Sequence, residues 1–383
     1  MGKSIAVTGL VLLAALSVLS GSDRQSRDFP ASPSFIGWPY DTGGARARAI
    51  MALVKTGPAS AIALARRSIL SDPISAPAVS ILGRSQLYAA QLPEAHKTFM
   101  VAGQLGWRDS MTQIYWLDQA IQAADYRVAA ERLDALLRQF PNDENGSKLL
   151  ALVSAAPEGR DALAARLKLK PAWAESYVTD VKNLPNDQLL QRVDVIRRSG
   201  PGNWACRQTS SFAQQLINSQ NLDEAQQVWR MGCPSSTSEV YDGGFEQLDT
   251  TRPTTGFDWV LSNRGDAEIS LVQDPFGHNV LAVEVSATIA LPIVRQLVVL
   301  KPGSYRLTWR TPDTGATEAQ ALRVALSCGH DYADAVPGSA VPGRAPTFTH
   351  DFVVDGRCPA RQLIFWLAPR GRVRLDDIAL ERI

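Results

Sequence analysis

The sequence has little of what nucleic-acid-binding proteins and the commonest enzymes depend on. Lys and Arg total 39 against 38 Asp and Glu, so the formal net charge is +1. No basic tract compensates locally, and without a positive field little would hold a phosphate backbone. The sequence also lacks the motifs of a serine nucleophile, a zinc protease, a phosphate-binding loop and a dinucleotide turn. No nucleic acid is therefore expected as a partner.

Histidine is scarce, with four in the whole chain. His330 and His350 each precede an aspartate, a pairing that could form an acid–base or metal site, but polar loop residues are the simpler explanation. Nothing singles out two of the many carboxylates as a glycosidase pair. The sequence therefore predicts a protein that is not an enzyme, with a glycan-active enzyme as the third alternative.

Cysteine is also scarce, but its distribution is informative. Cys206 and Cys233 fall in a helical part of the chain, and Cys328 and Cys358 in a β-rich part. No two are spaced as in zinc or thioredoxin-like motifs. An even division predicts one disulfide in each part, formed in an oxidising compartment. The alternative is four buried thiols.

The N-terminal pattern indicates an export signal. Lys3 precedes the apolar run 5–19, and the small residues Ser20 and Ser22 suit signal-peptidase cleavage. Residues 1–22 are thus either a cleaved signal peptide or a retained membrane anchor, a spanning helix needing about 20 apolar residues. A buried helix is the third reading. Residues 23–44, rich in Pro, Ser and Gly, are expected to be a linker.

Residues 45–233 carry Ala and Leu at three- and four-residue spacing, which predicts helices. A register that repeats about every 34 residues places small residues where two helices would cross and larger apolar residues one turn later. Its central copy is Gly83, Ala95, Phe99 and Ala102; the copy before it is Ala49, Ala61, Ala65 and Ser68, with Pro73; the copy after it is Leu117, Ala129, Leu133 and Leu136, with Pro141.

This register resembles the tetratricopeptide repeat. Trp107 stands where the central copy would have its proline, and residues 144–205 suit helical hairpins without a good register. The resemblance implies an α-solenoid whose concave groove binds a peptide or partner protein.

Beyond a linker at 234–239, the periodicity changes to two. Runs such as 280–285, 303–309 and 362–367 read as strands separated by turn residues, and no helical stretch follows. Residues 240–383 are therefore expected to form an antiparallel β-sandwich. The predicted fold class is a multidomain α + β protein.

Three motifs occur in order within this β part. Gly244-Phe245-Glu246 opens it, Pro302-Gly303-Ser304-Tyr305 forms a turn and strand, and Asp376-Asp377-Ile378 closes it. Together they resemble the galactose-binding-like jelly rolls that include many carbohydrate-binding modules. The resemblance implies a structural calcium, because calcium prefers carboxylate and carbonyl oxygens. Its ligands would be Glu246, the Gly244 carbonyl and Asp376 or Asp377; no other cofactor is required.

Glu246 and Asp376 also have ordinary roles that need no calcium. Glu246 would pair with an arginine, and Asp376 would accept hydrogen bonds from loop N–H groups. For glycan binding, the resemblance implies flat aromatic rings that stack on a sugar. The candidates are Trp259, Tyr305 and Tyr332, with core packing as the alternative role.

Together these patterns predict an exported, non-catalytic accessory protein of the bacterial envelope. It would assist assembly, secretion or surface retention of an exopolysaccharide, either in the periplasm or anchored in the inner membrane facing it. The first alternative is a protein-interaction scaffold that binds no glycan.

Overall fold

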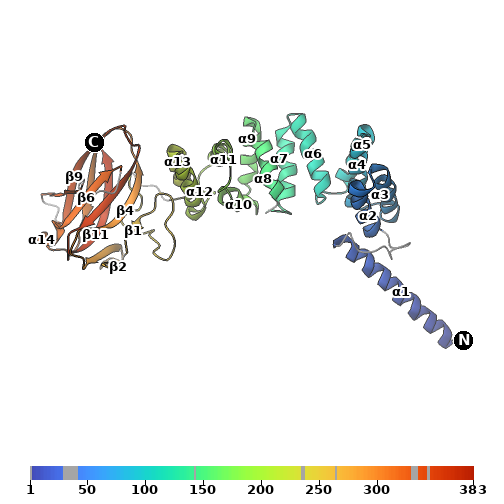
Figure 1. Cartoon of the computed structure of the whole chain (residues 1–383), viewed down its shortest axis with the longest axis horizontal. Helices are drawn as coiled ribbons and strands as arrows, with labels where there is room; N and C mark the ends of the chain where they lie inside the picture. The colour runs from blue at the N-terminus through green and yellow to red at the C-terminus, as the bar shows by residue number, and fades with distance from the viewer. Residues whose placement is uncertain are drawn as a thin grey trace. The chain divides into compact units, whose positions relative to one another are not determined.

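The computed structural model describes residues 2–28, 42–141, 144–233, 238–263, 265–328, 335–342 and 346–383. The chain divides into two compact units, Met1–Trp173 and Ala174–Ile383. The predicted α + β layout is confirmed, with helices in the N-terminal part and two antiparallel sheets in the C-terminal part (Figure 1). Most of the predicted linkers, residues 29–41 and 234–237, lie outside the described residues.

The described part of the first unit is helical. Its helices are α1 (Gly2–Asp28), α2 (Thr42–Lys55), α3 (Pro58–Ser71), α4 (Ala76–Tyr88), α5 (Leu92–Gln104), α6 (Ser110–Gln122), α7 (Tyr126–Leu137), α8 (Glu144–Ser154) and α9 (Pro157–Leu167). Within α1, the span Val7–Gln25 is long and apolar enough to cross a membrane, a test that signal sequences also pass. Export signal and membrane anchor both remain consistent with it.

Successive helices from α2 to α7 pack as hairpins, and small residues allow their close approach. At Gly83 in α4, a Cβ atom would lie 2.8 Å from the Phe99 ring of α5. Asp109 and Asp125 begin α6 and α7 by accepting backbone N–H groups at 2.8 and 3.1 Å. The Gly83–Phe99 contact joins two positions of the predicted register, while membership of the tetratricopeptide family stays a prediction.

The second unit begins with helices and continues into the sheets. The helices are α10 (Ala174–Thr179), α11 (Asn186–Ser199), α12 (Cys206–Asn218) and α13 (Leu222–Gly232). The strands, with one short helix, are β1 (Val260–Leu261), β2 (Ala267–Gln273), β3 (Asn279–Val285), β4 (Leu291–Val299), β5 (Gly303–Arg310), α14 (Ala316–Ala319), β6 (Leu322–Ser327), β7 (Val336–Pro337), β8 (Ser339–Ala340), β9 (Thr347–Val354), β10 (Ala360–Leu367) and β11 (Arg372–Arg382).

The strands form two antiparallel sheets, in the orders β1-β4-β10-β6-β7 and β2-β3-β11-β5-β9-β8. Alternate residues of both sheets meet in one core that includes Phe245, Trp259, Tyr305, Trp309 and Phe365. Two stacked sheets with a shared core are a β-sandwich. The finer assignment to a jelly roll stays a prediction.

Both predicted disulfides are present: Cys206 with Cys233, and Cys328 with Cys358. The first joins the start of α12 to the residue after α13, so it closes that helical hairpin. The second joins the residue after β6 to the loop before β10. Disulfides form and persist in oxidising compartments, so both agree with an exported protein.

Helices α12 and α13 pack onto the chain that leads into the sandwich. The Trp229 ring of α13 lies edge-on to Tyr241 and Phe257, with centroids 4.8 and 5.6 Å away. Gly256, at φ +63°, approaches this ring so closely that a Cβ atom would lie 2.5 Å from it. The predicted boundary at 234–239 thus falls within one compact unit, and the limits of independent domains stay a prediction.

Candidate functional site

The opening segment of the sandwich, around Gly243, crosses the last strand, β11, at one end of the sandwich. The carbonyl of Gly243 accepts the N–H of Ile378 at 2.9 Å. Gly243 is required there, because a Cβ atom would lie 1.8 Å from the Ile378 carbonyl oxygen. An irregularity in β11 between Asp376 and Ala379, with Asp377 at φ +47°, bends the strand at this crossing. The crossing brings the predicted residues Gly244 and Asp376 together.

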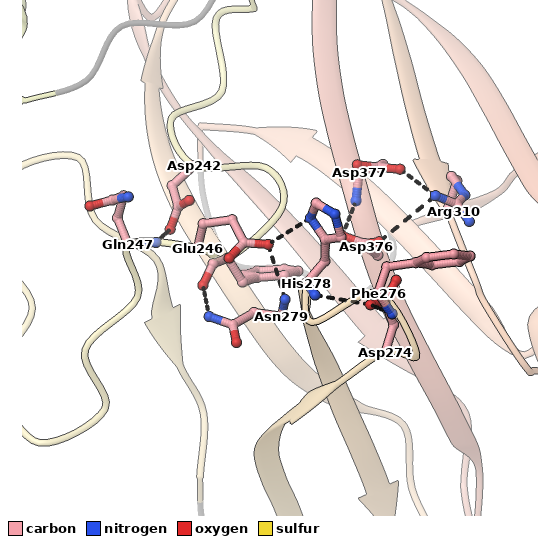
Figure 2. A network of polar contacts seen from close by, with 11 residues as sticks. Asp242, Glu246, Gln247, Asp274, Phe276, His278, Asn279, Arg310, Asp376 and Asp377 are labelled. Atoms are coloured by element: carbon pink, nitrogen blue, oxygen red, sulfur yellow. Dashed lines mark hydrogen bonds and ion pairs between the residues drawn. The ribbon is translucent and has the colours of Figure 1, made fainter.

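Figure 2 shows the polar network that surrounds this crossing. Glu246 accepts the backbone N–H of Asn279 at 3.0 Å, and its Oε1 lies 3.5 Å from Nδ1 of His278. On the other side, Arg310 donates to Asp377 at 2.6 Å and lies 4.0 Å from Asp376.

Asp376 is buried and accepts the N–H of Asp377 at 2.7 Å. Burial, chiefly, raises the pKa of its carboxyl group above the ordinary value. The backbone N–H that Asp376 accepts belongs to its neighbour within β11, and its role as an acceptor for loop N–H groups stays a prediction. Glu246 has a histidine neighbour rather than the arginine that the alternative reading proposed.

Two of the four predicted calcium ligands are engaged by other groups in this arrangement, while Gly244 and Asp376 lie close together. Arg310 already neutralises Asp377, and Glu246 is occupied by Asn279 and His278. Within the described residues, no group of three or more His, Cys, Asp or Glu side chains is placed to hold a metal ion. A structural calcium at Gly244, Glu246, Asp376 and Asp377 stays a prediction, which calorimetric titration with calcium tests.

An aromatic ring stands out at the same end of the sandwich. Phe276 lies in the turn between β2 and β3, and its side chain is 86% exposed. Asp274 holds the turn by accepting the N–H groups of Phe276 at 2.8 Å and of His278 at 2.9 Å. Figure 2 places Phe276 beside Asp274 and on the side of the network where Arg310 lies. The ring is thus exposed on a fixed backbone and next to polar groups.

The aromatic residues predicted to bind a sugar lie elsewhere. Trp259 is 1% exposed and its Nε1 donates to the carbonyl of Asp242 at 2.8 Å. Tyr305 is 2% exposed and its hydroxyl donates to the carbonyl of Lys301 at 2.9 Å. Tyr332 lies outside the described residues. Trp259 and Tyr305 present no ring face to solvent, so a sugar does not reach them in this structure.

Phe276 is missing from the sequence prediction. The available signal was an aromatic residue in a short turn, Asp274-Pro275-Phe276-Gly277-His278, between two alternating segments. Such turns are usually polar, so an aromatic residue there has no core to join. Attention to aromatic residues in turns, instead of those in strands, would have found it.

A polar hollow lies beside the network, between α12 and the segment 241–259. Its volume is about 190 Å³, and Asp242 and Asp258 both line it. Burial raises the pKa of Asp242 to about 6, although two backbone N–H groups oppose the shift. Burial also raises the pKa of Asp258. Each carboxylate therefore carries a desolvation cost at neutral pH.

Replacing Asp242 by Asn is expected to stabilise the protein at pH 7 and to leave it unchanged at pH 4. Folding raises the pKa of this acid, so the wild type loses stability as pH rises from about 4 to about 6, and the amide avoids that loss. Discounted for the carboxyl group's remaining solvent contact, the gain is about 1–2 kcal/mol. Urea denaturation at both pH values, with a chelator present, measures it. An equal gain at pH 4 would contradict the desolvation argument.

Comparison with known proteins does not assign this chain to a family. No family model matches the chain, and no curated protein matches it.

Solved structures give partial and distant matches. The enzymatically active domain of tailspike protein 4 from bacteriophage CBA120 is 15% identical, with a TM-score of 0.29 over 40% of this chain and 23% of that one. The carbohydrate-binding module TmCBM61, solved with β-1,4-galactotriose, is 16% identical, with a TM-score of 0.25 over 39% of this chain and 100% of that one. A family GH115 4-O-methyl-α-glucuronidase with specificity for decorated arabinogalactans is 11% identical, with a TM-score of 0.21 over 80% of this chain and 48% of that one.

These matches correct one prediction. The sequence predicted a protein that is not an enzyme, but the matched structures include an enzymatically active tailspike domain and a glucuronidase. The exclusion of enzymes is therefore wrong. At these identities and TM-scores the matches identify neither an activity nor a substrate for this chain.

Proposed function

We propose that this protein is exported and that its β-sandwich binds a glycan of the bacterial cell envelope at the Phe276 end. The observation that carries the proposal is the exposed Phe276 ring, held by a hydrogen-bonded turn among polar side chains. Sugars offer C–H faces that stack on aromatic rings and hydroxyl groups that pair with polar side chains. Phe276 supplies the first kind of contact.

The polar contacts would come from the network around the ring. Arg310 and His278 offer N–H donors, and Asp377 and Glu246 offer carboxylate acceptors. These groups are already oriented by one another, so binding would cost little side-chain ordering. An exposed ring on a fixed backbone, with oriented polar neighbours, suits a glycan better than it suits an apolar ligand.

Export rests on other features of the chain. The apolar helix α1 and the two disulfides both suit a protein that leaves the cytoplasm. In the envelope, glycan binding would serve the assembly, secretion or surface retention of an exopolysaccharide. Fractionation of cells separates a periplasmic protein from one anchored by α1.

The experiment is a glycan array probed with the purified exported chain, followed by incubation with each glycan that binds. Binding to envelope polysaccharides or their fragments is the expected result. Release of shorter sugars during the incubation would identify a glycan-active enzyme that uses this surface. An array with no bound glycan, together with unchanged extracellular polysaccharide in a deletion strain, would contradict the proposal.

A second candidate function belongs to the helical unit. A hollow of about 450 Å³ between α4, α6 and α8 is lined mostly by apolar side chains, among them Tyr88, Ile114 and Leu152, which are 62%, 44% and 56% exposed. Exposed apolar surface of this kind is typical of protein interaction sites. The candidate partner is an apolar segment of another envelope protein. Crosslinking from position 114 in cells, compared with the exposed Leu70 of α3, tests it.

A further inference from the structure

The outer face of β2, β3 and β11 carries a hollow that the proposed function does not use. Its volume is about 340 Å³, within the size range of small-molecule sites, and the loop after β5 and α14 also contribute to its lining. It opens at the edge of the sheet, because β2 is the outermost strand.

The pairing register explains the depth of this hollow. Ser270 of β2 lies opposite Ala282 of β3, and Ala282 lies opposite Arg374 of β11. The side chains of Ser270 and Ala282 are small, so the sheet is low at this row. In the row beside it, Glu268 lies opposite Glu284, and Glu284 lies opposite Arg372. A row of small side chains therefore forms the base of the hollow, and the longer charged side chains of the next row form one of its walls.

The hollow has more negative than positive groups. Four carboxylates line it, from Glu268, Glu284, Asp313 and Glu318, against the two guanidinium groups of Arg372 and Arg374. Arg372 pairs with Glu284 at 2.5 Å and Arg374 with Asp313 at 2.8 Å. Both arginines are thus engaged.

Glu268 and Glu318 are the two carboxylates of the hollow that pair with neither arginine. Glu318 accepts the N–H of Gly315 at 3.3 Å, so Glu268 is the one more open to a ligand. Among the described residues it has no Lys, Arg or His partner, and it faces the like charge of Glu284 across the strand pair. Like charges directly opposite each other destabilise a sheet. A ligand cation beside Glu268 would relieve this repulsion, and it would be held by a carboxylate that no arginine occupies.

We infer that this hollow binds a sugar residue that carries a protonated amine, with the ammonium group beside Glu268. The guanidinium groups and the hydroxyls of Ser270 and Thr314 would meet the hydroxyl groups of the same ring. The inference rests on the proposed function in taking the ligand to be a glycan. It concerns a separate surface, so the two proposals fail separately.

Titration calorimetry of the purified exported chain with glucosamine oligomers at pH 6 tests the inference, because the free amines are then protonated. We expect binding that weakens with salt and that falls at least tenfold in Glu268→Gln. The control Glu381→Gln changes an exposed carboxylate elsewhere on β11 and should leave binding unchanged. Phe276→Ala should also leave it unchanged, which separates this surface from that of the proposed function.

N-acetylglucosamine oligomers and spermidine complete the experiment. We expect the acetylated oligomers, which lack the charge, to bind at least tenfold more weakly. Equal binding of acetylated and free oligomers would contradict the role of the amine. Spermidine binding as tightly as the sugar would contradict the inference that the ligand is a saccharide. Absence of binding, or binding that Glu268→Gln leaves unchanged, would overturn the site.

Discussion

Gly243→Ala is expected to destabilise the C-terminal unit by about 3 kcal/mol or more. The added Cβ would lie 1.8 Å from the carbonyl oxygen of Ile378 and 2.8 Å from its carbonyl carbon. Both atoms belong to the backbone of β11, so the two segments must separate and the Ile378–Gly243 hydrogen bond is lost. In a unit of this size the loss lowers the Tm by about 6–12 °C.

The neighbouring glycine provides the matched control. A Cβ atom at Gly244 would meet nothing closer than Oδ1 of Asp376 at 3.7 Å, an ordinary contact. Gly244→Ala should therefore stay within about 0.5 kcal/mol of the wild type. Calorimetric melting of both variants compares them directly. If Gly243→Ala had the same Tm as the wild type, the close contact of Gly243 with Ile378, which brings the polar network together, would be contradicted.

Trp229→Ala is expected to cost about 3–5 kcal/mol and to loosen the sandwich, although the residue lies in a helix. Trp229 is 4% exposed and packs on Tyr241, Phe257 and the backbone at Gly256. These contacts join α13 to the segment that leads into the first strands. Removing the ring leaves a cavity where helix and sandwich meet, so the backbone amides of β4 should exchange hydrogen faster than in the wild type.

Two further variants isolate the cause of this effect. The Trp229 Nε1–H is buried and has no acceptor among the described residues, so Trp229→Phe loses no hydrogen bond and should retain most of the stability. Trp107→Ala removes a tryptophan that is 48% exposed in the first unit and should leave exchange in β4 unchanged. Exchange in β4 unaffected by Trp229→Ala would show that α12 and α13 fold apart from the sandwich.

The sequence predicted the classes of structure because each class has its own periodicity. Helical spacing ends near Cys233, where the first disulfide closes the α12–α13 hairpin. Alternation in segments such as 303–309 places Tyr305, Leu307 and Trp309 in the core. The Pro- and Ser-rich segment at 234–239 marks where this periodicity changes. It does not show whether the two sides are independent, and Trp229 packs across it.

The candidate site was only partly predictable. Gly244 and Asp376 come together as the motif order implied, because the opening segment and the closing strand are neighbours. The partners of Glu246 and Asp377 were not foreseen: His278 and Arg310 come from a turn and a strand end that only the fold brings near. A tryptophan beside a strand-like segment does not reveal which face it occupies, so the sequence leaves both a sugar-binding and a core role open for Trp259. The structure buries it in the core.

The measurement that tests the central claim most directly is the affinity of Phe276→Ala for the glycan that the array identifies. Loss of the ring should weaken binding at least tenfold without lowering the Tm, because the ring is 86% exposed and contributes little to the core. The matched control is Val353→Ala on β9, where an apolar side chain is 85% exposed away from the network. That variant should bind as the wild type does. Equal affinity of Phe276→Ala and the wild type would show that the glycan does not bind at this end of the sandwich.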